Sequence, residues 1–299
     1  MKKKIAIVGL GLIGGSFARA FKKYTDYTVI GFNRTQSTAE KALADGAIDA
    51  IGTPDDLKEV DIVLLSMYPK VSCDFVEKHI ETFKPGCIIT DDCGIKSYLV
   101  ERLTPLCQAH GLYFVGGHPM AGREVSGYKA SDADLYKGAS MLLVPTEAST
   151  PEIVKQVKAM FSQIGFGQLV ITTPEHHDRM IAYTSQLCHV VSSAYIKSPS
   201  ELEHKGYSGG SYRDLTRVAY LNETMWTELF IENKQALVPE IDEIIHHLTV
   251  PRCDCWRGCR YAVPAAQRRQ TKKRTIWLKI TLKKQEADVL SGWNVRFYI

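Results

Sequence analysis

Histidine side chains occur at two places in the chain where they could accept a proton during catalysis. His118 follows a short apolar segment and is itself followed by Arg123 and Glu124. Gln186 and His189 lie three residues apart in a pattern typical of a helix, so they share one face of it. An imidazole near the end of a strand can take a proton from a substrate hydroxyl. A lone histidine on an apolar helix is as often a core residue, and for His189 both interpretations stay open.

Two arginines in the segment 209–217 are suited to binding carboxylates. Arg213 and Arg217 flank Asp214, and a planar guanidinium can hold a carboxylate through two parallel hydrogen bonds. Asp214 could equally be a plain ion-pair partner of either arginine. For His176 and His177 we expect a solvated helix start rather than a ligand role. The histidines fit no zinc pattern and have no thiolate partners, so we expect no metal site.

A glycine-rich motif near the start of the chain predicts a dinucleotide site. Residues 9–14 read Gly9-Leu10-Gly11-Leu12-Ile13-Gly14, which is the pattern G-x-G-x-x-G, placed between a predicted strand and a predicted helix. The glycines permit a tight turn and let the backbone approach a pyrophosphate, while the helix N-terminus offers free N–H groups. Hydride could therefore pass from a substrate to a nicotinamide cofactor.

The residues after the second predicted strand favour NADP over NAD. An Asp or Glu at this point would hold the ribose 2′-hydroxyl of NAD, but the chain has Asn33, Arg34 and Thr35. All three side chains can donate hydrogen bonds to a 2′-phosphate. NAD remains the alternative, with Arg34 then a solvated residue. Ser66, at the end of the third predicted strand, is a further candidate for cofactor binding.

The elements that must position these residues alternate between strands and helices. Short β-branched apolar runs predict strands, and apolar residues at helical spacing predict helices between them. This order predicts an α/β fold with an N-terminal Rossmann-type doubly wound parallel sheet. The expected strands are 4–8, 27–32, 61–67, 87–90, 113–116, 140–145 and 168–172, and the expected helices between them are 12–21, 38–45, 71–83, 95–110 and 151–164.

The period changes after Pro174, where long helical patterns follow one another without strands. They cover residues 175–197, 212–220 and 223–247. We therefore predict a dinucleotide-binding domain over 1–172 and an all-helical substrate and dimerisation domain over 173–248. Residues 249–299 are an atypical basic tail.

Composition excludes several classes of protein. Apolar residues make up 45% of the 299 and charged residues 23%, as in ordinary globular proteins. A net charge of +4 is too small to imply a nucleic-acid partner. No apolar run is long enough to span a membrane. The apolar run after Lys2-Lys3-Lys4 is cut by the glycines of the motif, so we do not interpret it as a signal peptide and expect a cytoplasmic protein with reduced cysteines.

Taken together, these blocks closely resemble the prephenate dehydrogenase family of tyrosine biosynthesis. The resemblance runs from Lys4 to about His247 and is most specific at 117–122, 175–189 and 209–217. It implies oxidative decarboxylation of prephenate to 4-hydroxyphenylpyruvate, with hydride passing to NAD or NADP. It also implies a homodimer built through the helical domain. Arogenate as the substrate, and a catalytically inert NADP-binding protein, are the alternatives.

The resemblance also implies roles for individual residues. His118 matches the catalytic histidine that hydrogen-bonds the ring hydroxyl, His189 a second active-site histidine, and Arg217 the arginine that binds a substrate carboxylate. Glu124 matches an acidic residue near the pocket mouth, and Asp214 a residue that steadies Arg217. Gln186 stands where some relatives have His, and Arg123 where some have Thr; both are candidate substrate-binding residues.

Two parts of the chain depart from the family pattern. Many members have Ser at the position of Gly94, where it contacts the catalytic histidine and the substrate. Here either a neighbouring group or water supplies that contact, or the contact is not needed. The tail holds twelve Lys or Arg against three Asp or Glu over 248–299, with cysteines at 253, 255 and 259. A basic arm for nucleic acid and a metal knuckle are possible interpretations, but we favour a shifted reading frame.

Overall fold

The computed structural model describes residues 2–249 of the chain. These residues form two compact units, one ending at Asn233 and one beginning at Lys234. The predictions made for the basic tail lie outside the described residues, except at its first position. Among the described helices, none has the length and apolar character needed to cross a membrane.

The first unit is built on an eight-stranded sheet with the order β3-β2-β1-β4-β5-β6-β7-β8. Neighbouring strands run parallel except β6 and β7, which are antiparallel. The α/β prediction is confirmed, and the sheet is mostly rather than wholly parallel. The strands are β1 (Lys4–Val8), β2 (Thr28–Phe32), β3 (Ala50–Ile51), β4 (Ile62–Leu65), β5 (Ile88–Asp91), β6 (Tyr113–Pro119), β7 (Ser140–Pro145) and β8 (Gln168–Ile171).

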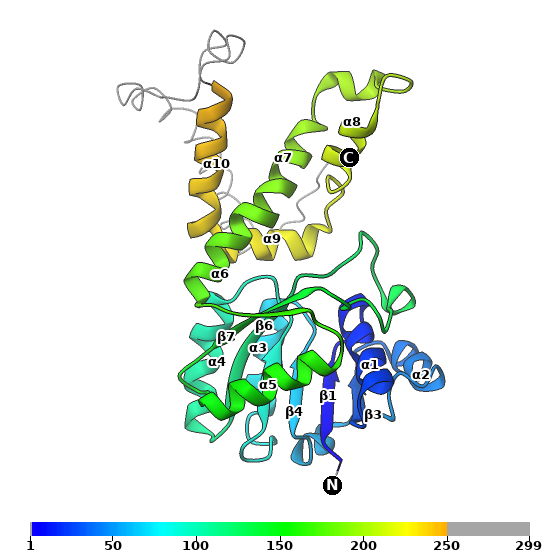
Figure 1. Ribbon diagram of the computed structural model, residues 1–299, viewed down its shortest axis with the longest axis vertical. Helices are drawn as coiled ribbons and strands as arrows, with labels where there is room; N and C mark the ends of the chain where they lie inside the picture. Colours follow the sequence, from blue (N-terminus) through cyan, green and yellow to red (C-terminus); the bar gives the residue numbers. More distant parts are fainter. Residues whose placement is uncertain (1, 250–299) are drawn as a thin grey trace. The chain divides into compact units, whose positions relative to one another are not determined.

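Helices cover both faces of this sheet (Figure 1). Alternate residues of β1 belong to different apolar clusters, because successive side chains of a strand point to opposite faces. Ile5 and Ile7 pack with Phe17 and Phe161, whereas Ala6 packs with Leu103. The helices of the sheet layer are α1 (Leu12–Tyr24), α2 (Gln36–Ala44), α3 (Pro69–His79), α4 (Ser97–Ala109) and α5 (Pro151–Gln163). Short 3₁₀ turns occupy Pro54–Lys58 and Tyr128–Ala130.

After β8 the first unit continues with helices alone, as the sequence predicts. They are α6 (Pro174–Ile181), a π turn (Ala182–Gln186), α7 (Leu187–Tyr195), a 3₁₀ turn (Pro199–Glu203), α8 (Gly210–Thr216) and α9 (Glu223–Glu232). Leu229 of α9 is buried in the same apolar cluster as Leu99 of α4, so this helical segment packs on the sheet layer. Helix α10 (Lys234–Thr249) belongs to the second unit. A domain boundary near residue 172 stays a prediction.

Two differences from the predicted elements have local causes. Strand β3 is two residues long and pairs only with β2, and so short a strand leaves no apolar pattern to detect. The predicted helix 175–197 is interrupted by the π turn, which holds one residue more than an α-helical turn and lies between α6 and α7.

A fully buried ion pair fixes the segment between β5 and α4. The ammonium of Lys96 bonds the carboxylate of Asp91, and neither side chain is exposed. Asp91 also accepts the backbone N–H of Cys93 at 2.9 Å and that of Gly117, on β6, at 3.0 Å. These contacts satisfy both carboxylate oxygens, as a buried charge requires. The pair therefore joins the ends of two neighbouring strands.

We predict that Lys96→Met destabilises the fold by about 3–5 kcal/mol, because it leaves the Asp91 carboxylate buried without a counter-charge. Unfolding by denaturant, followed by circular dichroism, measures the loss. Lys155→Met is the control, since Lys155 is exposed on α5 and surface changes stay within about 0.5 kcal/mol. A loss for Lys96→Met no larger than that of the control would contradict the structural role of the pair.

Candidate active site

The glycine-rich turn between β1 and α1 has space for a ligand at one of its three glycines. Gly9 has φ of +102°, and a Cβ there would lie 2.2 Å from the carbonyl oxygen of Ser66. A Cβ on Gly14 would lie 1.9 Å from the carbonyl oxygen of Gly9, so these two glycines make the turn and its packing possible. A Cβ on Gly11 would meet nothing within 4 Å. The turn thus suits a pyrophosphate that lies against Gly11 and the N-terminus of α1, whose first two residues are Leu12 and Ile13.

The three residues predicted to read the 2′-phosphate differ in how free their donors are. The Asn33 side-chain oxygen accepts the Leu10 N–H at 3.0 Å, and its NH₂ group donates to the carbonyl of Thr35 at 3.0 Å. Asn33 therefore ties the end of β2 to the glycine-rich turn. Arg34 and Thr35 are exposed, and within residues 2–249 Arg34 makes no ion pair. These two side chains are the available donors.

Ser66, which the sequence predicts to bind the cofactor, lies beside the glycine-rich turn. Its N–H donates to the carbonyl of Val8 at 2.8 Å, and its hydroxyl donates to the carboxylate of Asp92. A Cβ on Gly14 would lie 2.7 Å from the Ser66 hydroxyl oxygen, which shows how closely they approach.

His118, near the end of β6, is the first member of a chain of three hydrogen-bonded side chains. Its Nδ1 lies 2.9 Å from Nε2 of His177, and Nδ1 of His177 lies 2.8 Å from the carboxylate of Asp178. Asp178 also accepts the backbone N–H groups of Lys96, at 2.7 Å, and Ser97, at 2.8 Å, at the start of α4. The chain thus runs from the sheet through α6 to the N-terminus of α4.

This chain fixes the tautomer of His118. Burial opposes ionisation of Asp178, but hydrogen bonds from His177 and Ser97 hold its pKa below the usual range, so it is a carboxylate that only accepts. His177 then carries its proton on Nδ1 and accepts at Nε2. His118 must therefore donate from Nδ1, and its Nε2 keeps a lone pair. These proton positions follow from the donors and acceptors of the hydrogen-bond network.

The same surroundings keep His118 uncharged. Burial lowers the pKa of His118 well below its usual value, and the neighbouring His177 and Lys96 lower it further. Burial also lowers the pKa of His177, against the opposing effect of Asp178. An uncharged imidazole with a free Nε2 lone pair can act as a general base.

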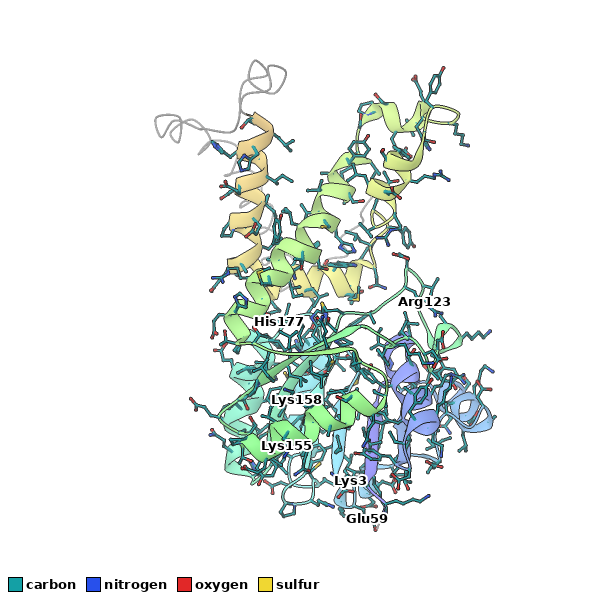
Figure 2. All side chains as sticks on the ribbon, in the orientation of Figure 1. Lys3, Glu59, Arg123, Lys155, Lys158 and His177 are labelled. Carbon is teal, nitrogen blue, oxygen red and sulfur yellow. The ribbon has the colours of Figure 1, made fainter. Side chains whose placement is uncertain are left out.

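The prediction that His177 is a solvated residue is wrong. The side chain is 1% exposed, because the N-terminus of α6 packs against the start of α4 and brings His177 onto His118. Figure 2 shows His177 where the helical segment meets the sheet layer. His176 points away and is exposed, as predicted, with its Nδ1 2.8 Å from the Arg179 guanidinium.

The π turn places His189 on the face of the helix that carries His177. Residues about 11 apart share a face of an α-helix after three turns, and one extra residue in a π turn makes that spacing 12. His177 and His189 are 12 residues apart. Nδ1 of His189 lies 3.0 Å from the carbonyl of Ser185, and its ring packs on Trp226 with centroids 3.9 Å apart. Burial lowers the pKa of His189, and Nδ1 donates to the carbonyl, so its Nε2 is also a free acceptor.

Gln186 is bound within the helical segment rather than exposed toward a ligand. Its NH₂ group donates to the carbonyl of Leu229 at 3.1 Å, and its oxygen accepts from Asn233 at 2.8 Å. Asn233 also donates to the carbonyl of Asp178 at 2.9 Å. Gln186 is 1% exposed, so the geometry gives it a positioning role.

The charged residues predicted to bind substrate divide into two places. Arg217, directly after α8, pairs with Glu124 on the loop after β6, and both side chains are more than half exposed. Arg123 pairs instead with Asp132 at 2.7 Å, and Figure 2 shows it apart from His177. Asp214 is exposed and makes no ion pair within the described part of the chain, so Glu124 rather than Asp214 steadies Arg217 here.

Gly94 leaves room for the side chain that the family pattern places there. A Cβ on Gly94 would lie 3.5 Å from the side chain of Leu229, an ordinary van der Waals distance. The missing hydroxyl therefore follows from the residue type and not from a steric block.

Sequence reasoning missed four residues that hold this site together. They are Asp91, Lys96, Asp178 and Asn233. Each acts on a partner distant in the sequence, and the only local signal is a pair of acidic residues directly after a predicted strand. Within residues 2–249, His, Cys, Asp and Glu side chains form no group of three or more that could hold a metal ion.

Comparison with known proteins matches both parts of the chain to one family. Residues 17–175 match the model for the prephenate dehydrogenase nucleotide-binding domain, and residues 173–252 match the model for the prephenate dehydrogenase dimerization domain. The chain is 33% identical to the cyclohexadienyl dehydrogenase of Zymomonas mobilis over 82% of its own length and 86% of that protein. It is 32% identical to the prephenate dehydrogenase of Lactococcus lactis, over 82% and 69% of the two chains.

A solved structure is similar over nearly the whole chain. It is prephenate dehydrogenase from A. aeolicus in complex with hydroxyphenyl propionate and NAD⁺, at a TM-score of 0.76 and 25% identity. The similarity covers 97% of this chain and 99% of that one. With the glycine-rich turn and the His118 chain described above, these matches leave one conclusion. The chain belongs to the prephenate dehydrogenase family.

Proposed function

We propose that this protein oxidises prephenate to 4-hydroxyphenylpyruvate and carbon dioxide, with His118 as the base and NADP as the preferred hydride acceptor. The observation that carries the proposal is the chain from Asp178 through His177 to His118, which leaves Nε2 of an uncharged imidazole free. The bound nicotinamide would accept the hydride that leaves C4 of the substrate ring. The residues of this chain supply orientation, one base and charge recognition.

Proton removal and loss of carbon dioxide are linked through the substrate ring. Nε2 of His118 accepts the proton of the C4 hydroxyl as the C4–H bond gives up hydride. The bond to the opposite carboxylate then breaks and carbon dioxide leaves. Its electron pair makes the ring aromatic, so the substrate itself supplies much of the driving force. The resulting phenolate oxygen takes the proton back from Nε2 of His118, which gives 4-hydroxyphenylpyruvate and restores the base. The proton passes to a histidine whose Nδ1 already donates to His177, and the carboxylate of Asp178 stabilises the charge at the far end.

Arg217 is the proposed partner of a substrate carboxylate. In the structure its guanidinium pairs with Glu124, and both groups are accessible to solvent. A substrate carboxylate would take the place of Glu124 on the guanidinium, so binding exchanges one ion pair for another. Glu124 then contributes to selectivity, because a ligand without a carboxylate cannot compete with it.

The helical segment supports a homodimer. It carries large apolar side chains with high exposure, among them Tyr183 at 57%, Tyr195 at 49% and Tyr220 at 86%. Exposed apolar surface of this kind favours contact with another copy. The family model that matches this part of the chain is described as a dimerization domain.

An assay at 340 nm with prephenate and either NADP⁺ or NAD⁺ tests the activity, and the same assay with arogenate separates the two substrates. Absorbance that rises only with arogenate would replace the proposed substrate. No rise with either substrate would refute the proposed dehydrogenase activity.

We expect His118→Asn to lower kcat by about 10²–10⁴, the usual range for losing a general base, with a much smaller effect on prephenate binding. Steady-state kinetics with both substrates gives the two effects separately. His176→Asn is the matched control, because His176 is exposed and lies outside the hydrogen-bonded chain. A near-normal kcat for His118→Asn would move the base role to His189.

We expect Arg34→Ala to raise the KM for NADP and to leave the KM for NAD nearly unchanged, because Arg34 is an exposed donor at the end of β2 without an ion-pair partner among residues 2–249. The two cofactors are compared in one preparation. Equal losses with both would show that Arg34 does not bind a 2′-phosphate.

We expect Arg217→Ala to raise the KM for prephenate by roughly 10–150-fold, because hydrogen bonds to charged groups are worth ~1.5–3 kcal/mol. The KM for NADP should not change, and Arg217→Lys should recover only part of the loss. Arg179→Ala, which removes an exposed arginine on α6, is the control. If Arg217 were only structural, both KM values would rise together and the melting temperature would fall.

A further inference from the structure

The strand order places the glycine-rich turn and His118 at different positions along the carboxyl edge of the sheet. The glycine-rich turn follows β1 and His118 lies near the end of β6, while β4 and β5 lie between them. A dinucleotide whose pyrophosphate lies on the turn must reach toward His118 for hydride transfer. Its nicotinamide half therefore crosses the ends of β4 and β5, where Ser66 and Asp92 are found.

Asp92 lies beside this path, and its carboxylate is bound by a residue that lies next to the glycine-rich turn. Its carboxylate accepts the hydroxyl of Ser66, and that hydroxyl lies against Gly14 in the first turn of α1. Its backbone N–H donates to the carbonyl of Leu65, at the end of β4, at 3.1 Å. The residue as a whole is only partly exposed. No step of the proposed reaction uses this carboxyl group.

We propose that Asp92 selects the oxidised form of the cofactor, because its carboxylate lies beside the path of a nicotinamide ring that is positively charged when oxidised and neutral when reduced. The inference rests on the proposed function for its ligand but needs no particular substrate. An enzyme that consumes the oxidised cofactor gains from releasing the reduced one. Asp92 thus favours binding of one form and departure of the other.

The charge of Asp92 changes near neutral pH. Burial raises its pKa to about 7, and Asp91 on β5 raises it as well, whereas the Ser66 hydroxyl and Lys96 lower it. Tyr136 and Cys93 also interact with it electrostatically, and burial raises the pKa of both groups well above their usual values, so both stay uncharged. Above about pH 7 the group is a carboxylate and attracts the oxidised ring. Below that pH it is neutral, and the preference is lost.

Isothermal titration calorimetry of the whole protein without substrate tests this directly. The ligands are NADP⁺ and NADPH, with NAD⁺ and NADH in parallel, between pH 6 and 8. In the unmodified protein, affinity for the oxidised forms should rise with pH and affinity for the reduced forms should not. Asp92→Asn should weaken binding of the oxidised forms roughly tenfold, as expected for opposite charges near a protein surface, and should remove the pH dependence. Binding of the reduced forms should stay within about twofold.

Two further variants keep the result interpretable. Ser66→Ala leaves the carboxylate in place but removes a donor that favours its charged form, so the pH midpoint should move upward. Asp55→Asn is the control, because Asp55 is an exposed carboxylate that pairs with Lys58. It should change neither the affinity for the oxidised forms nor that for the reduced forms. Equal weakening of oxidised and reduced forms by Asp92→Asn, or a pH dependence that survives it, would overturn the proposal. So would failure of the unmodified protein to bind any nicotinamide cofactor, whereas normal binding without prephenate turnover would refute only the proposed reaction.

Discussion

The carboxylate of Asp178 is the contact on which the rest of the site depends. It caps the start of α4 through two backbone N–H groups, and the same carboxylate holds Nδ1 of His177. An aspartate at a helix N-terminus is stabilised by the free N–H groups and by the helix dipole, so its charge is maintained although it is buried. A neutral group in its place would leave the tautomer of His177 undetermined. One interaction therefore stabilises the helix, fastens α6 to the sheet layer and directs the lone pair of His118.

Lys96 closes this arrangement into a ring. Its backbone N–H donates to Asp178, while its ammonium bonds Asp91, which accepts the N–H of Gly117 next to His118. His118 is thus held from both sides, by its ring through His177 and by the neighbouring backbone through Asp91. The positive charge of Lys96 also works against protonation of both histidines. A buried ion pair adds little net stability compared with apolar residues, so its value here lies in the position and charge state that it imposes on His118.

Sequence reasoning succeeds where the determinant is local. The glycine-rich turn, the strand before it and the strand that leads to His118 each follow from a few consecutive residues, although that strand continues through His118 to Pro119 rather than ending at residue 116. It fails where distant residues meet. His177 next to His176 reads as the polar start of a helix, and only the packing of α6 on α4 shows that one of the two is buried. Gln186 reads as a polar residue aligned with His189, yet its partners come from α9. Gln186 and His189 do lie in one continuous helical segment, as predicted. The π turn that aligns His189 with His177 has no recognisable signal in the sequence.

The division of labour between the two layers explains why substrate recognition and hydride chemistry can vary separately. The ends of β1, β2, β4, β5 and β6 carry the proposed cofactor contacts and the proposed base, and the spacing of these strands is fixed by hydrogen bonds of the sheet. Arg217 and His189 come from the helical segment, which is joined to the sheet layer through the contacts of Asp178 with the start of α4 and through the packing of Leu229. A change in the helices can therefore alter the surroundings of Arg217 without moving His118. A change at Asp178 cannot be confined in this way, because it is the acceptor that both layers share.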